Sequence, residues 1–166
     1  MSEPSPAPTI ATIGVYEFDA ASFIRALEGA GVTQVIDIRQ RRGVRGPQYA
    51  WANSRRLQAL LAEAKIAYAH YPSLAPTTEL RQLQYREDAA QGVGKRSRVR
   101  LAPGYVRGYT EEILDRAPLE PLVDGLPADG IAALLCVEAT PQACHRSLVA
   151  GRLAERFGFE VLNIEP

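Results

Sequence analysis

The chain has 166 residues, of which 46% are hydrophobic and 23% charged, and 19 basic residues balance 19 acidic ones. This length and composition fit one globular domain, and no run of about 18 apolar residues is present to cross a membrane. The first eight residues hold neither a basic nor an apolar segment, so we expect a flexible tail over 1–8, one domain over 9–166 and a cytoplasmic location.

The basic residues are 17 arginines and 2 lysines, and they are unevenly distributed. Six arginines and no acid lie between Ile38 and Ala62, and a second acid-free basic group runs from Lys95 to Arg107. Guanidinium groups bind phosphate and carboxylate bidentately, so both groups are candidates for anion binding. An arginine-rich composition with solvated loops explains the same pattern equally well.

The first elements form a strand, a helix and a strand. Residues 9–14 are rich in β-forming residues, Asp19 is a suitable N-cap for a helix over 20–30, and residues 33–38 form a second strand with Asp37 near its end. A β-α-β unit of this length predicts two neighbouring parallel strands with a right-handed crossover.

An arginine- and glycine-rich stretch, residues 39–51, follows the second strand and is a candidate substrate loop. Asn53 is expected to cap a helix with an i, i+3, i+4, i+7 apolar stripe, and residues 66–71 read as a third strand. A polar helix is then expected over 77–90, followed by a basic loop over 92–103 that is too polar to pack.

The remaining pattern predicts a helix over 104–116 whose tyrosines belong to the core, a proline-punctuated connection over 118–127, a strand over 131–137, a helix over 141–157 and a strand over 159–164. The order βαβαβ, helices, βαβ predicts a single-domain, three-layer α/β fold, Rossmann-like or rhodanese-like, with a mainly parallel sheet.

Residues 131–148 are the stretch where we expect the chemistry. Five apolar residues lead into Cys136 as in a strand buried on both faces, and a ligand crevice in an open α/β sheet lies at such strand ends. Two cysteines, an acid, a histidine and an arginine lie within eleven positions there: Cys136, Glu138, Cys144, His145 and Arg146.

Each of these residues has a functional and a structural interpretation. Cys136, before a positive helix terminus, is either a reactive thiolate or a small core residue. With Thr140-Pro141 starting the helix, a rotation of about 100° per residue puts His145 and Arg146 beside the buried stripe and Cys144 on the far side. Arg146 then either binds an anion at the helix start or pairs structurally with Glu138 or Asp37.

A zinc site of Cys136, Glu138, Cys144 and His145 is disfavoured by the same reasoning. The cysteines are spaced C-x7-C and not C-x2-C, and the helical angle separates Cys144 from His145. We therefore predict no metal and no cofactor.

Three segments carry a family resemblance: Thr12-Ile-Gly14, Val35-Ile-Asp-Ile-Arg39 and, most specifically, Cys136-x-Glu-x-x-Pro-x-x-Cys-His-Arg-Ser147. The chain resembles the domain-of-unknown-function 488 family from about Thr9 to Ile164. The family commonly has His after Thr-Ile-Gly and Gly-Gly after the third strand, where this chain has Val15 and Ala75-Pro76. The resemblance supplies candidate residues but implies no established reaction. If that His takes part in chemistry in other members, this chain either lacks the activity or performs it differently.

A fainter resemblance is to rhodanese domains, in which an Asp-x-Arg strand end precedes a strand that ends in the active cysteine. Asp37-Ile-Arg39 and Cys136 stand in similar places. The loop differs, because residues 137–141 contain no glycine, include Pro141 and place the Glu138 carboxylate where an anion would bind. Sulfur transfer and thiol phosphatase chemistry are therefore disfavoured.

Our leading hypothesis is a crevice at the ends of the second and fourth strands that binds an anionic, phosphate-bearing ligand such as a nucleotide or nucleic-acid end, with hydrolysis as the favoured reaction. The residues assigned to the ligand are Gly14, Arg39, Arg45 and Arg146. The residues assigned to chemistry are Cys136, Asp37 and Glu138 as acid or base, and His145 as proton carrier. The alternatives are a thiol-dependent sulfurtransferase or redox enzyme built on Cys136, and a non-catalytic nucleic-acid-binding module.

Overall fold

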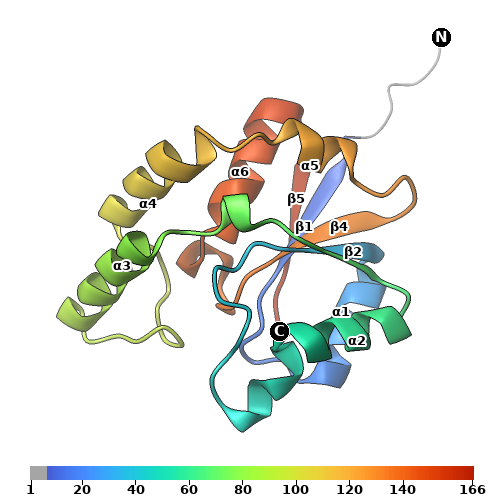
Figure 1. Cartoon of the computed structure of the whole chain (residues 1–166), viewed down its shortest axis with the longest axis horizontal. Coiled ribbons are helices and arrows are strands. Elements are labelled where there is room, and N and C mark those ends of the chain that lie inside the picture. The colour runs from blue at the N-terminus through green and yellow to red at the C-terminus, as the bar shows by residue number, and fades with distance from the viewer. Residues whose placement is uncertain (1–6) are drawn as a thin grey trace.

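A five-stranded parallel sheet forms the centre of the computed structural model, which describes residues 7–166 (Figure 1). Its strands are β1 (Thr9–Ile13), β2 (Val32–Asp37), β3 (Ala67–His70), β4 (Ile131–Leu135) and β5 (Glu160–Ile164). The strand order is β3-β2-β4-β1-β5, so the wholly apolar β4 is central and buried on both faces.

Helices cover both faces of the sheet (Figure 1). Helices α1 (Ala20–Gly29) and α2 (Ser54–Glu63) pack on one face. The other face carries α4 (Pro103–Tyr109), α5 (Glu120–Asp124) and α6 (Arg146–Phe157), with α3 (Thr78–Ala90) packed against α4. This confirms the predicted three-layer, Rossmann-like α/β fold.

The topology puts a crevice at the carboxyl end of β4. The chain crosses from β1 to β2 to β3 in one direction through α1 and α2, then returns through α3 to α6 on the opposite face, as right-handed crossovers require. The loops after β2 and β4, which are neighbours, therefore leave toward opposite faces of the sheet. A ligand crevice forms between such diverging loops.

The first two strands are not neighbours, and that prediction is wrong. β4 lies between them: Ile13 is in register with Leu135, which is itself in register with Asp37. Closeness along the chain favours a local β1–β2 pair. The most apolar strand instead takes the central position, where both of its faces are covered.

Two predicted helix starts also differ from the structure. Pro141–Ala143 forms only a 3₁₀ turn, Cys144 is extended at φ −140° and ψ 148°, and α6 begins at Arg146. Asn53 does stand at the start of α2, but its side chain gives the helix no cap; its Oδ1 accepts from the Val44 amide at 2.8 Å instead. Asn53 therefore braces the arginine-rich loop.

The basic loop over 92–103 is mostly exposed, but part of it packs, contrary to expectation. Arg98, Leu101 and Ala102 are buried, and the Leu101 amide donates to the Gln142 carbonyl at 3.1 Å. The predicted helix over 104–116 consists of α4 and a following π-helical segment, Thr110–Leu114, and its tyrosines Tyr105 and Tyr109 are buried as predicted.

Most of the predicted tail, residues 1–6, lies outside the described residues, and Pro8 already accepts a hydrogen bond from the Glu160 amide at 2.8 Å. Within residues 7–166, no helix combines the length and the apolar character needed to cross a membrane.

Candidate functional site

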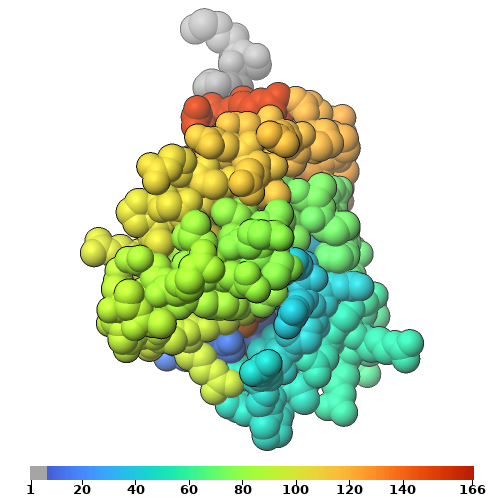
Figure 2. All heavy atoms as spheres, turned by 60° about the vertical axis from the view of Figure 1, so that its left-hand side comes forward, coloured from blue at the N-terminus to red at the C-terminus, as the bar shows by residue number. Residues whose placement is uncertain are grey.

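A cavity of about 660 Å³ opens at the carboxyl ends of β2 and β4. In Figure 2 its mouth lies between the green and yellow segment, which holds α3 and the loop after it, and the cyan segment that follows β2. Cys136, Val137, Glu138 and His145 line the cavity from the β4 side. The structure thus brings the arginine-rich loop after β2 to the end of β4, as predicted.

The lining of this cavity is strongly cationic. Glu138 is its only carboxylate among the described residues. The cationic residues that line it are Arg39, Arg41, Arg45, Arg81, Lys95, Arg96 and Arg98. Both basic groups of the sequence therefore contribute to one cavity.

Most of these cations are not neutralised by the protein. Among the ion pairs of residues 7–166, only Arg39 and Arg98 of the lining residues have a carboxylate within 4.0 Å. Arg96 instead lies 5.4 Å from the ring centroids of both Tyr16 and Tyr49 and donates to the Arg45 carbonyl at 3.0 Å. This contact draws the 92–100 loop against the loop after β2.

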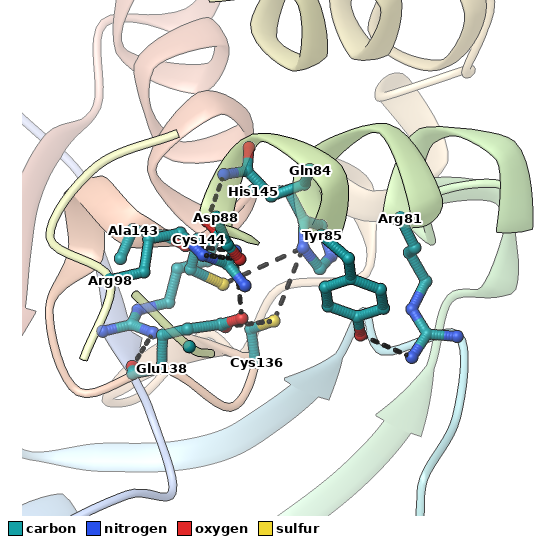
Figure 3. Close-up of polar contacts among 12 residues, drawn as sticks. Arg81, Gln84, Tyr85, Asp88, Arg98, Cys136, Glu138, Ala143, Cys144 and His145 are labelled. Carbon is teal, nitrogen blue, oxygen red and sulfur yellow. Dashed lines mark hydrogen bonds and ion pairs between the residues drawn. The ribbon is translucent and has the colours of Figure 1, made fainter. Parts of the chain in front are cut away.

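Cys136, Cys144 and His145 form a buried cluster at one end of the cavity (Figure 3). The His145 Nδ1 lies 3.4 Å from the Cys136 Sγ and 3.8 Å from the Cys144 Sγ. The other ring nitrogen, Nε2, lies 2.8 Å from the Ile38 carbonyl oxygen, which can only accept, so Nε2 carries a proton. Nδ1 is therefore directed at the two sulfur atoms.

The expectation that Cys144 faces away from this site is wrong. A helix that began at Pro141 would turn Cys144 away, whereas the extended backbone at Cys144 turns its thiol toward Cys136 and His145. Cys144 does not line the cavity itself, which Cys136 and His145 do. The Cys144 thiol reaches Cys136 and His145 because the helical backbone is interrupted between the 3₁₀ turn and α6.

The two thiols have opposite acidities. Burial, together with the hydrogen bond and charge of Cys144, raises the pKa of Cys136 well above its ordinary value. Burial acts in the same sense on Cys144, but the hydrogen bond with Cys136 and the charge of His145 lower the pKa of Cys144 well below its ordinary value. Burial would lower the pKa of His145, and the neighbouring Cys144 raises it. Of the two thiols, Cys144 is therefore the one whose surroundings favour the thiolate.

Glu138 is buried between the cluster and Arg98 (Figure 3). Its Oε2 accepts from the Cys136 thiol at 3.5 Å, and its Oε1 lies 3.6 Å from the Arg98 Nη1. Burial and the nearby Cys144 raise the pKa of Glu138. Arg98 also pairs through Nε with the Asp88 Oδ2 at 3.1 Å, so it connects α3 to the end of β4. Arg98 therefore ties the basic loop to both α3 and the loop after β4.

Asp37 and Arg39, at the end of β2, bind each other. The Arg39 Nε and Nη2 donate to the two Asp37 carboxylate oxygens at 2.9 and 2.8 Å, and Nη1 donates to the Ala52 carbonyl at 3.0 Å. The Tyr68 hydroxyl donates to Asp37 at 2.6 Å. Arg39 contributes to the cavity lining, whereas Asp37 does not.

Arg146 and Gly14 lie behind the site, outside the cavity lining. The Arg146 guanidinium is fully buried and donates to the backbone carbonyls of Glu138 and Ala139, not to a carboxylate. A Cβ on Gly14 would lie 2.0 Å from the Glu138 carbonyl oxygen. Both residues therefore position the loop after β4. Val15, where the family commonly has His, is buried in the core and donates to the Val137 carbonyl at 2.8 Å.

Five cationic cavity residues were not individually assigned to the ligand from the sequence: Arg41, Arg81, Lys95, Arg96 and Arg98. Four of them belong to the two acid-free basic groups that the sequence did mark as candidates for anion binding. Arg81 lies on α3 among acids and offers no such signal.

Comparison with known proteins gives one result. No curated protein and no solved structure matches the chain, so the fainter likeness to rhodanese domains is not confirmed. The family model described as Domain of unknown function DUF488 matches residues 19–153, which include the loop after β2 and the whole motif from Cys136 to Ser147. The chain therefore belongs to the DUF488 family of domains of unknown function.

Proposed function

We propose that this protein is a hydrolase that binds an anionic, phosphate-bearing ligand in the cationic cavity. The observation that carries the proposal is the charge of the lining, in which seven cationic side chains face one carboxylate. Guanidinium groups bind phosphate oxygens bidentately, and a partly enclosed site strengthens these interactions relative to water. Arg41, Arg45 and Arg81 have no carboxylate partner among the described ion pairs and are the first choices for binding the phosphate.

Glu138 is the general base of the proposed reaction, because it is the one carboxylate that lines the cavity. It takes a proton from a water molecule, whose oxygen adds to phosphorus. The phosphorus–oxygen bond to the leaving group then breaks, and the leaving oxygen receives the proton from Glu138. The neighbouring arginines stabilise the charge that develops on the phosphoryl oxygens.

A thermal-shift screen tests the binding step. Reduced, EDTA-treated protein is heated with nucleoside mono-, di- and triphosphates, sugar phosphates, inorganic phosphate and short 5′-phosphorylated oligonucleotides. A ligand of the native state at about 100 times its Kd stabilises it by about 2.7 kcal/mol. We expect stabilisation that Arg45→Ala weakens and Arg56→Ala does not, since Arg56 is exposed on α2 outside the cavity lining. Equal responses of the two variants, or no response to any compound, contradict the proposal.

The same screen distinguishes an enzyme from a binding module. Each stabilising compound is followed by ³¹P NMR for hydrolysis. The chain would be a nucleic-acid-binding module if it binds oligonucleotides but not mononucleotides, if that binding weakens steeply with salt, and if no product forms.

A thiol-dependent enzyme is the second candidate, favoured by the 3.4 Å contact between Cys136 and His145. Cys136 lines the cavity, and His145, held by the Ile38 carbonyl, is placed to accept the thiol proton. The rate of Cys136 alkylation against pH, measured in Cys144→Ser, tests this role. A profile like that of a free thiol argues against it.

A further inference from the structure

The Cys136, Cys144 and His145 cluster has the geometry of a metal site. Its two sulfur atoms and one ring nitrogen lie within 4.8 Å of one another. A tetrahedral zinc ion with its usual bond lengths separates a thiolate sulfur from an imidazole nitrogen by about 3.6 Å and two sulfurs by about 3.8 Å. The observed sulfur–nitrogen distances of 3.4 and 3.8 Å fall on either side of that separation.

The hydrogen bond of His145 to Ile38 is the second observation. A histidine that binds a metal through one ring nitrogen commonly donates from the other to a carbonyl or carboxylate. Here Nε2 donates to the Ile38 carbonyl at 2.8 Å, which leaves the Nδ1 lone pair directed at the sulfur atoms. The imidazole is thus held in the tautomer and orientation that a metal requires.

Charge balance is compatible with a cation in this cationic surrounding. Two thiolates and a neutral imidazole carry two negative charges, which one divalent ion cancels. The occupied cluster therefore adds no net charge beside Lys95 and Arg98.

We propose that Cys136, Cys144 and His145 bind a borderline-soft divalent cation such as Zn²⁺. Two cysteines and one histidine are a ligand set that zinc enzymes use with a fourth, open coordination position. Because Cys136 and His145 line the cavity, the open position faces it, and the Glu138 carboxylate lies 3.5 Å from the Cys136 sulfur. The metal site goes beyond the proposed function and does not require it; only a role of metal-bound water in hydrolysis rests on that function.

Titration of the reduced, EDTA-treated protein with Co²⁺ is the direct test. We expect a thiolate-to-cobalt charge-transfer band and intense visible bands of tetrahedral Co²⁺ that saturate at one ion per chain and are displaced by Zn²⁺. Cys136→Ser, Cys144→Ser and His145→Ala should each lose or greatly weaken the bands. His70→Ala, which changes the only other histidine, should keep them. Bands that survive both serine variants, or that fall equally in His70→Ala, overturn the assignment.

A second measurement uses the unaltered chain and does not depend on the folding of variants. Cys136, which lines the cavity, should react with an alkylating reagent in the EDTA-treated protein and be protected by one equivalent of Zn²⁺. No charge-transfer band and no protection would overturn the metal site. The phosphate-ligand screen, which is performed without metal, would still decide the proposed function separately.

Discussion

The neighbouring strands β2 and β4 each end near a carboxylate that has an arginine partner. The two carboxylates differ in how closely they are paired. At the end of β2, the Asp37 carboxylate is fully occupied by Arg39 and the Tyr68 hydroxyl. At the end of β4, Glu138 makes only a 3.6 Å contact with Arg98 and a weak hydrogen bond from a thiol, and it lines the cavity. The closed pair supports the structure, whereas the open carboxylate remains available for chemistry.

The pKa values of the two carboxyl groups are shifted in opposite directions. Burial would raise the pKa of Asp37, but its hydrogen bonds and ion pair with Arg39 lower it below the ordinary value. Burial and Cys144 raise the pKa of Glu138, because its cationic neighbours compensate only in part. Two buried carboxyl groups therefore have opposite pKa shifts, depending on how closely an arginine is held.

The largest expected effect is on the proposed hydrolysis at the end of β4. Glu138→Gln keeps the shape of the side chain and removes the base, so hydrolysis of the stabilising ligand should slow by about 10²–10⁴-fold. ³¹P NMR or phosphate release measures the rate. Glu63→Gln, an exposed change on α2, is the matched control. An unchanged rate in Glu138→Gln would assign the base elsewhere.

The next largest effect is a loss of stability when the ion pair at the end of β2 is broken. Asp37→Asn leaves the buried Arg39 guanidinium without its carboxylate partner, and breaking a buried ion pair costs about 3–5 kcal/mol. Urea unfolding at neutral pH measures the loss. The control is Asp115→Asn, which removes a more exposed pair with Arg152 and should cost at most about 1 kcal/mol. Similar losses in both variants would show that burial of the pair is unimportant.

A smaller loss is expected where the backbone approaches the β4 loop. Gly14→Ala introduces a Cβ that would lie 2.0 Å from the Glu138 carbonyl oxygen, so the loop must shift at a cost of about 1–3 kcal/mol. Thermal unfolding measures it. Gly151→Ala, where the new Cβ meets nothing within 4 Å, should instead stabilise α6 by about 0.5–1 kcal/mol. If Gly14→Ala is neutral, the loop tolerates displacement.

Loss of one cavity arginine should weaken ligand binding by about 10- to 100-fold, since a charge-assisted hydrogen bond contributes about 1.5–3 kcal/mol. Arg81→Ala removes a lining guanidinium from α3, and Arg86→Ala removes an exposed one from the same helix outside the lining. Isothermal titration of the stabilising ligand gives both affinities. Equal weakening would indicate that only the net charge of the helix matters.

The smallest expected effect is the pH dependence of the stability that the Asp37–Arg39 pair contributes. Because the folded-state pKa of Asp37 is lowered, its stabilisation is fully present above the ordinary value of 3.8 and is lost as the pH falls through the folded-state pKa. The difference in unfolding free energy between the parent and Asp37→Asn should therefore be constant above about pH 5 and shrink in acid. Urea unfolding at several pH values measures it. A difference that grows in acid would contradict the assignment of this pair.

The amino-acid sequence by itself determined the layered α/β fold, the strand that ends at Cys136 and the presence of Glu138 and His145 beside it. These follow from local patterns, since apolar runs, caps and the alternation of strands and helices depend on neighbouring residues. The two arginine-rich groups were visible for the same reason, although their meeting in one cavity was not.

The tertiary structure decided the rest. The placement of β4 between β1 and β2 depends on long-range pairing, which no local pattern encodes. The direction of the Cys144 thiol depends on one extended residue between a 3₁₀ turn and α6, where helical periodicity does not apply. The roles of Asp37 and Arg39 likewise differ from those of Glu138 and Arg98 only through side-chain geometry, because a 2.8 Å ion pair occupies a carboxylate that a 3.6 Å contact leaves available.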